Sequence, residues 1–221
     1  MLITNKLPNS LSAESYKSLR NNIEKIAERD NIKTLLITSS VSGEGKSTIS
    51  GNLAVSLSEN NNKVFVIDCE LRRPSLHNKF DIENEYGVGE VLLGDCKLKS
   101  AIKKINSNLF ILTAGKVSNN TSELLATNNM KELLDEVRIN YDYIIINSAS
   151  IIPVSDTRVL ANNVDAAILV VRSNKSTNKN VIDGYNKLKD TGINILGIIL
   201  NDINSKSLKK LYKEYSINNK K

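Results

Sequence analysis

The sequence predicts a doubly wound α/β fold, in which helices cover both faces of a mainly parallel sheet. Six segments rich in β-branched and aliphatic residues alternate with helical patterns along the chain. Segments that are almost wholly apolar, such as YIIIN and AAILVV, are expected where both faces of a parallel sheet are buried. We therefore expect three layers, with the sheet between two layers of helices.

The elements follow from hydrophobic periodicity. The predicted strands span residues 34–38, 64–68, 110–113, 143–147, 166–171 and 193–200. The clearest helical patterns cover 49–57, 122–137, 156–161 and 177–189. Ahead of them, residues 12–29 place Tyr16, Leu19, Ile23, Ile26 and Ala27 on one stripe. This stripe predicts an amphipathic leading helix, for which Ser12 is a candidate N-cap.

Size and composition indicate one soluble globular domain over residues 1–221, with a lysine-rich, flexible tail at 205–221. The longest apolar runs are far too short to span a bilayer, and the N-terminus lacks a signal-peptide pattern, so we expect a cytoplasmic protein. Two cysteines without CxxC spacing and a single histidine support neither a zinc site nor a disulfide framework. The net charge of +6 is mild and no aromatic platform accompanies the lysine clusters, so nucleic acid is not an expected partner.

A phosphate-binding loop follows the first predicted strand. Ser40 to Ser47 fits the P-loop pattern, except that serine replaces the first glycine. Gly43 and Gly45 let backbone N–H groups approach phosphate oxygens, with Glu44 between them and Thr48 in the helix behind. Lys46 would reach the β- and γ-phosphates of ATP, and the Ser47 hydroxyl would ligate Mg²⁺. This strand, loop and helix context predicts ATP binding.

Phosphoryl transfer also requires carboxylates near the phosphates, and two strand ends supply candidates. Asp68 ends the second strand and Glu70 follows it, so either side chain can face a metal ion. Asp68 has an alternative interpretation as a residue that caps the next loop. At the end of the fourth long strand, where a Walker B aspartate would complete the metal shell, stands Asn147. Its amide keeps the shape but lacks the charge, which predicts weaker Mg²⁺ binding or slower turnover.

Other charged residues near these segments have two possible roles each. Arg72 and Arg73 can pair with phosphates or with acids of a neighbouring subunit, or lie solvated. Asp156 begins a predicted helix, so it can stabilise the helix dipole as well as take part in catalysis. We interpret His77 as a structural or surface residue.

Together these segments resemble the bacterial tyrosine kinases of the capsular and exopolysaccharide systems, a branch of the deviant-Walker P-loop ATPases. Beyond the P-loop, the resemblance rests on ESYKSLRNNIE in the leading helix, VFVIDCELRRPSLH, GVGEVLLGD, AGKVSNNTSELL and LGIILND. It implies that Asp68 activates the tyrosine hydroxyl and contacts the metal shell, with Glu70 as a helper. It also implies that Asn201 reads the adenine. A simple turn asparagine is the alternative for Asn201.

The resemblance also implies partners and acceptors. Members of the family phosphorylate C-terminal tyrosines of a neighbouring subunit in a ring, held partly by an ExxRxxR-type motif that Glu14, Lys17 and Arg20 match imperfectly. The tail here offers Tyr212 and Tyr215 as acceptors. A kinase without membrane spans implies a separate membrane protein, whose cytosolic tail recruits it to the inner face of the plasma membrane and activates it.

Three functions are compatible with these features of the sequence. The first is an ATP-dependent tyrosine kinase that regulates polysaccharide synthesis or export. The second is a catalytically weak ATP-binding scaffold of the same system, favoured by Asn147, by the SAS that replaces the usual TPP after it, and by the sparse tail tyrosines. The third is a partitioning-type ATPase. Such relatives generally carry an extra lysine near the start of the P-loop, and SSVSGEGK has none before Lys46, which disfavours this function.

Overall fold

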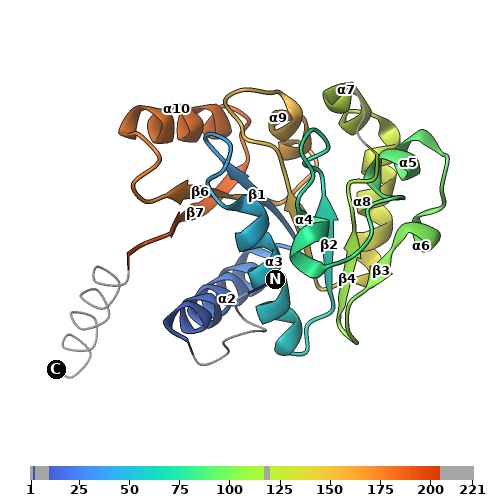
Figure 1. Ribbon diagram of the computed structural model, residues 1–221, viewed down its shortest axis with the longest axis horizontal. Helices are drawn as coiled ribbons and strands as arrows, with labels where there is room; N and C mark the ends of the chain where they lie inside the picture. Colours follow the sequence, from blue (N-terminus) through green and yellow to red (C-terminus); the bar gives the residue numbers. More distant parts are fainter. Residues whose placement is uncertain (1, 3–9, 117–119, 205–221) are drawn as a thin grey trace.

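A seven-stranded sheet with the order β3-β4-β2-β5-β1-β6-β7 forms the centre of the protein (Figure 1). The computed structural model describes residues 2, 10–116 and 120–204. Every neighbouring pair of strands is parallel except β3 and β4, which are antiparallel. The strands are β1 Thr34–Ser39, β2 Val64–Asp68, β3 Lys103–Lys104, β4 Leu109–Leu112, β5 Tyr143–Asn147, β6 Ala166–Arg172 and β7 Asn194–Asn201. The mainly parallel sheet predicted from the sequence is confirmed.

Helices cover both faces of this sheet. They are α2 Leu11–Asp30, α3 Lys46–Glu59, α4 Leu76–Phe80, α5 Val88–Leu93, α6 Leu98–Ala101, α7 Thr121–Leu125, α8 Asn128–Asn140, α9 Asp156–Ala161 and α10 Asn178–Lys189. The two-residue strand β3 and the short helices α4, α5 and α6 were not predicted. None of the described helices is long and apolar enough to cross a membrane.

Two helical predictions need correction. Ser10, not Ser12, caps α2, because Ser10 has the extended backbone of a cap (φ −78°, ψ 156°) and its Oγ accepts from the Ala13 N–H at 3.1 Å. The predicted helix 122–137 is two helices, α7 and α8. The break falls at Thr127, whose backbone is extended (φ −69°, ψ 157°) and whose hydroxyl donates to the Leu124 carbonyl at 2.8 Å.

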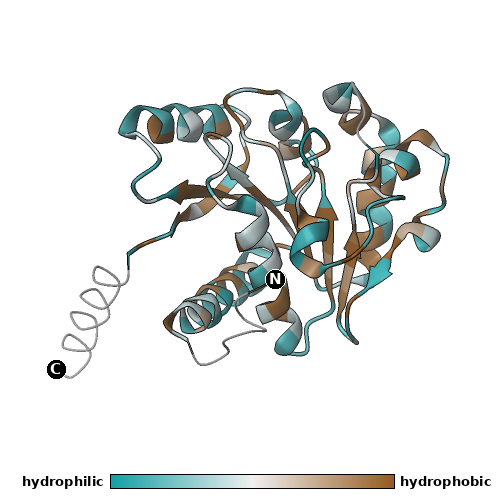
Figure 2. Cartoon of the chain, viewed as in Figure 1, coloured by the Kyte–Doolittle hydropathy of each residue, from teal (hydrophilic) through white to brown (hydrophobic). Residues whose placement is uncertain are grey.

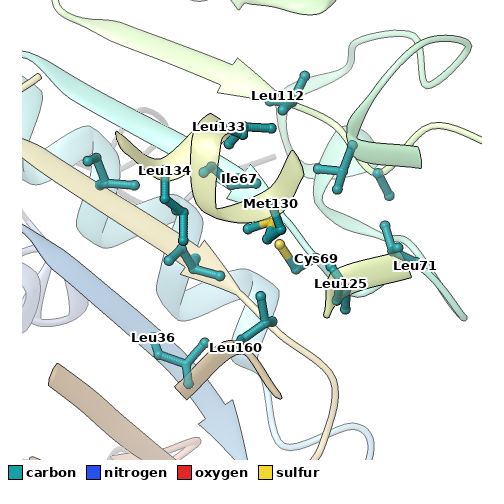
Figure 3. Packing of buried hydrophobic residues seen from close by; sticks show 14 of the residues in the cluster. Leu36, Ile67, Cys69, Leu71, Leu112, Leu125, Met130, Leu133, Leu134 and Leu160 are labelled. Atoms are coloured by element: carbon teal, nitrogen blue, oxygen red, sulfur yellow. The ribbon is translucent and has the colours of Figure 1, made fainter. Parts of the chain in front are cut away.

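Alternate residues of each strand enter two separate apolar clusters, one on each face. Leu36 and Ile67 belong to the cluster under α5, α7, α8 and α9, where Figure 3 shows them packed with Leu133, Leu134 and Leu160. Leu35 belongs to the opposite cluster, beneath α2 and α3. The long strands are accordingly mostly hydrophobic, whereas the two-residue strand β3 is hydrophilic and the helices are hydrophilic on much of their outer surface (Figure 2). Burial of each large aliphatic side chain contributes about 1.5–3 kcal/mol and fixes the register of the strands.

The strand order positions the site. Strand β5 lies between β1 and β2, and its register pairs Asn147 with Asp68 on one side and with Ile37 on the other. The loop that follows β1 and the loop that follows β2 therefore emerge at the same edge of the sheet, beside the end of β5. Crevices at the carboxyl ends of parallel strands are the usual ligand sites of this architecture.

Candidate active site

The loop between β1 and α3 is an anion cradle at the N-terminus of α3. Gly43 (φ 80°) and Gly45 (φ 101°) both adopt the left-handed backbone region, which residues with a Cβ rarely occupy. A Cβ at Gly45 would also collide with the side-chain amide of Asn201, and a Cβ at Gly43 with the ammonium of Lys175. The two predicted glycines are therefore favoured by their positive φ angles, and the loop backbone is available to phosphate oxygens.

Lys46, the first residue of α3, is a nearly buried cation at this cradle. Only 6% of the residue is exposed. Its Nζ donates to the Ser150 Oγ at 3.1 Å and lies 3.7 Å from the Glu70 Oε2. Burial lowers the pKa of Lys46, and the nearby carboxylates, Glu70 first, oppose that shift. The ammonium is thus held between a hydroxyl and a carboxylate, and a phosphate group can replace either partner.

Asp68 is a fully buried carboxylate tied to Asn147. The Asn147 amide donates from Nδ2 to the Asp68 Oδ1 at 2.8 Å, and the same Nδ2 lies 3.3 Å from the Ser47 Oγ. Backbone N–H groups of Glu70 and Leu76 donate to Asp68 at 3.2 and 3.3 Å. Burial raises the pKa of Asp68 to about 6, although these hydrogen bonds oppose the shift. Asp68 therefore also holds the loop after β2, as the alternative interpretation expected.

A cavity of about 390 Å³ opens over the cradle. Its lining is Ser42, Gly43, Gly45, Lys46, Ser47, Thr48, Glu70, Arg73, Ser75, Lys79 and Arg172. Most predicted nucleotide-site residues are thus brought together, while Asp68 and Asn147 lie buried beneath. A larger cavity of about 640 Å³ between α2 and β7 has a mainly apolar lining and none of the phosphate-binding groups, so it is not the candidate active site.

Two predicted nucleotide-site residues lie elsewhere. The Glu44 side chain is fully buried behind the loop, where it accepts from the Val41 N–H at 3.0 Å and contacts the Ser176 hydroxyl. Only the Glu44 backbone can therefore contact phosphate. Asn201, at the end of β7, donates to the Glu44 carbonyl at 2.9 Å and lines a neighbouring groove with Tyr16 and Ile49. Its amide supports the P-loop, and its contact with adenine stays a prediction.

The donors fit Mg²⁺ better than a metal that needs an all-protein cage. Among the described residues, no cluster of three His, Cys, Asp or Glu side chains forms a metal site. The oxygens at this edge of the sheet are the Ser47 hydroxyl and the carboxylates of Asp68 and Glu70. Mg²⁺ is commonly held by one or two such groups, by substrate phosphates and by water. Burial raises the pKa of Glu70, and Lys46 opposes that shift.

Arg72 and Asp156, whose roles the sequence did not decide, form an ion pair with each other. Arg72 donates from Nε and Nη2 to the two Asp156 oxygens at 3.0 and 3.1 Å, and the Thr121 hydroxyl donates to Asp156 at 2.9 Å. Asp156 is fully buried at the first position of α9. This carboxylate joins the loop that carries Glu70 to α7 and α9, and so has a positioning role in addition to its favourable place at a helix N-terminus.

Sequence reasoning missed a second support of the P-loop, contributed by the segment after β6. Lys175 donates from Nζ to the Ser42 carbonyl at 3.0 Å, and Arg172 donates from Nη1 to the Gly43 carbonyl at 3.3 Å. Arg172 also pairs with Asp202 at 2.9 Å. The strand-end argument that found Asp68 would have found Arg172, because Arg172 ends β6 next to β1. No sequence signal pointed to Lys175.

The structure describes the predicted oligomerisation residues of α2 but not the predicted acceptor tyrosines. In α2, Lys17 pairs with Glu14 at 2.8 Å, whereas Arg20 donates to the Ser56 carbonyl of α3 at 3.3 Å. Arg20 thus has an intramolecular partner. The acceptors Tyr212 and Tyr215 lie outside the described residues, as does the whole tail 205–221.

Comparison with known proteins places this site in a family. The AAA domain family matches residues 32–191. The tyrosine-protein kinase YwqD of Bacillus subtilis is 36% identical over 88% of this chain and 82% of its own length. The kinase domain of the Escherichia coli tyrosine kinase ETK superposes with a TM-score of 0.87 at 31% identity, covering 91% of this chain and 79% of that one. The chimerical protein CapA2B2 has the same TM-score at 30% identity, covering 91% and 89%. With a P-loop, a buried aspartate after β2 and relatives of this similarity, the chain belongs to the bacterial tyrosine-protein kinases.

Proposed function

We propose that this protein transfers the γ-phosphate of ATP, in the presence of Mg²⁺, to tyrosine hydroxyls of proteins. Tyr212 and Tyr215 would be its sites of autophosphorylation in trans, and the reaction would regulate capsular or exopolysaccharide synthesis or export. The observation that carries the proposal is the convergence of Lys46, Ser47 and Glu70 on one cavity, with Asp68 directly beneath.

Each residue has a definite task in this reaction. The loop amides and Lys46 bind the phosphate chain and stabilise the charge that develops during transfer. Ser47, Asp68 and Glu70 would hold Mg²⁺, which offsets charge on the phosphates when bound. Asp68 would accept the proton of the tyrosine hydroxyl, since it is a carboxylate directly beneath the cavity, held beside Ser47 by Asn147. The Arg72–Asp156 pair would keep Glu70 beside Lys46.

Asn147 supplies a hydrogen bond to Asp68 but no charge, so an Asn147→Asp variant should bind Mg²⁺ more tightly. Two carboxylates would then face each other in place of the 2.8 Å amide contact. Their repulsion should lower the stability of the metal-free protein at pH 7.5, because like charges at this separation cannot both ionise cheaply. With Mg²⁺ and ATP, the lost stability should return and phosphotransfer should rise by about tenfold.

Thermal unfolding with EDTA and with Mg²⁺, together with the kinase rate, measures these changes. Asn186→Asp, an exposed substitution in α10, is the matched control. An Asn147→Asp variant whose stability and rate respond to Mg²⁺ as the wild type does would contradict the assignment of this position to the metal shell.

The second candidate function is a nucleotide-dependent scaffold with little phosphotransfer. The specific observation in its favour is the Asn147 amide, which occupies the Asp68 oxygen that faces Ser47. Such a protein would bind ATP and assemble with its partner without modifying tyrosine.

We also propose that the protein works at the inner face of the plasma membrane, recruited and activated by the cytosolic tail of a membrane protein. Assembly into a ring would involve the exposed face of α2 around Glu14 and Lys17. Arg20, which is engaged with α3, would contribute to a ring contact only after exchanging its partner.

The deciding experiment incubates the purified full chain with Mg²⁺ and ATP, with and without the partner's cytosolic tail, and maps phosphotyrosine by mass spectrometry. We expect phosphate on tyrosine that disappears in an Asp68→Ala variant. ATP binding without any phosphotyrosine in either condition would reject the kinase and support the scaffold.

A further inference from the structure

The rim of the cavity over the P-loop is strongly cationic. Besides Lys46 at its floor, three basic side chains line it: Arg73, Lys79 and Arg172. Glu70 is the one acidic residue in that lining. Arg73 is exposed and Lys79 is half-buried, so both are accessible from the mouth.

These cations differ in whether an acidic side chain pairs with them. Lys46 is engaged by Glu70, and Arg172 is paired with Asp202 across the ends of β6 and β7. Neither Arg73 nor Lys79 forms an ion pair with any of the residues that the structure describes. Within the part of the chain that the structure describes, two positive charges in the lining segment 70–79 therefore have no acidic partner.

Arg73 and Lys79 belong to the same segment as other residues of the candidate active site. Arg73 lies three residues after Glu70, and Lys79 lies four residues after Ser75, on the same face of α4. Ser75 itself contacts the P-loop Ser47, hydroxyl to hydroxyl at 2.9 Å. The segment 70–79 thus borders the cavity and begins two residues after Asp68, which would receive the tyrosine proton.

Arg73 and Lys79 are not part of the usual cradle for nucleotide phosphates. The loop amides, the N-terminus of α3, Lys46 and Mg²⁺ already provide the usual cradle for a triphosphate. We propose that Arg73 and Lys79 bind acidic residues flanking the acceptor tyrosine, so that this kinase selects tyrosines in acidic segments. The inference rests on the proposed kinase function and names the chemical class of its protein substrates.

The chain's own tail has the opposite character. Tyr212 and Tyr215 lie in SLKKLYKEYSINNKK, where lysines outnumber the single glutamate. A basic segment is repelled by an uncompensated cationic rim, so acidic acceptors in other proteins should be modified faster than this tail.

A binding experiment tests the selection without requiring turnover. Fluorescent nine-residue peptides with a central phenylalanine in place of tyrosine, flanked by glutamates, by serines or by lysines, are titrated with the full chain. Mg²⁺ and a non-hydrolysable ATP analogue are present throughout. We expect the glutamate peptide to bind about fivefold or more tightly than the serine peptide, the lysine peptide to bind most weakly, and the differences to shrink at high salt.

With the ATP analogue at saturating concentration, the double variant Arg73→Glu/Lys79→Glu should reverse this order. Lys99→Glu/Lys131→Glu changes the net charge by the same amount at exposed positions on α6 and α8, and should keep the wild-type order. This control separates a local rim effect from the general attraction of acidic peptides to a protein of net charge +6.

Three results would overturn the inference: equal affinities for the three peptides, an order that the control pair changes as much as the rim pair, or a rim pair that keeps the wild-type peptide order at saturating analogue. Rates with the matching tyrosine peptides then test the proposed function separately. Selective binding without phosphorylation would leave the inference standing and reject the kinase activity, whereas phosphorylation regardless of flanking charge would do the reverse.

Discussion

An Asp68→Asn variant is expected to lose phosphotransfer by about a thousandfold while it remains folded. The amide retains the shape of the side chain and can still accept from Asn147, which donates to Asp68 at 2.8 Å in the wild type. It can neither accept the tyrosine proton nor offset the charge of Mg²⁺. The initial rate of phosphotyrosine formation at saturating ATP measures the loss.

The same substitution should stabilise the metal-free protein at neutral pH. Burial raises the pKa of Asp68 to about 6 from an ordinary value of 3.8, so the folded state binds the proton more tightly than the unfolded state does. This contribution to the free energy of unfolding is therefore complete below about pH 4 and is lost as the pH rises to about 6. Above that pH the charged carboxylate costs roughly 2–3 kcal/mol, which asparagine avoids.

Thermal unfolding in EDTA at pH 4 and pH 7.5 checks the sign. We expect Asp68→Asn to unfold at a higher temperature than the wild type at pH 7.5 and at a similar temperature at pH 4. Asp135→Asn, on the exposed face of α8, is the control for removing one acid. A variant destabilised at pH 7.5 and not at pH 4 would show that the charged carboxylate is favourable to folding, and an active one would remove Asp68 from catalysis.

A Lys46→Met variant is expected to reduce phosphotransfer by about a hundredfold to a thousandfold, because one preorganised cation at the phosphates is lost. Its affinity for ATP should also fall, by about tenfold or more, since hydrogen bonds to charged groups contribute about 1.5–3 kcal/mol. In the free protein, Glu70 would lose a counter-ion 3.7 Å away. The pKa of Glu70, already raised by burial, should rise further.

Isothermal titration with an ATP analogue separates the two effects of Lys46→Met. A Lys131→Met substitution on the exposed surface of α8 should change neither affinity nor rate. If Lys46→Met kept the wild-type affinity and rate, the phosphates would have to bind away from the cradle at the N-terminus of α3.

The sequence predicted the six long strands to within about a residue at most ends, because each is a continuous apolar run between polar loops. The sequence also located the main site residues, because each lies at the end of a strand or just after the loop that follows one. These residues are Lys46, Ser47 and Asp68. Ser10 as the cap of α2 and the break at Thr127 were missed. Both depend on the backbone angles of one residue among several similar candidates, and local composition does not distinguish them.

The supports of the site lay beyond sequence reasoning. Lys175 reaches Ser42 across 133 positions of the chain, and Asn201 reaches Glu44 across 157. For Glu44, the sequence suggested a role that its side chain does not have in the structure. Its place between two glycines suggested a ligand contact, yet its carboxylate turns inward to Val41 and Ser176.

The sequence by itself determined the order of strands and helices, the phosphate cradle and the identity of the residues that would carry the chemistry. Those properties are local, since they depend on periodicity, on glycine at positive φ and on residue types within a few positions of one another. Only the tertiary structure decided the partners: β5 lies between β1 and β2, so that Asn147 contacts Asp68, Arg72 pairs with Asp156, and Arg73 and Lys79 line one cavity with Glu70. Those contacts join segments far apart in the chain, and their energies arise only once packing of the sheet brings them within reach and removes them from water.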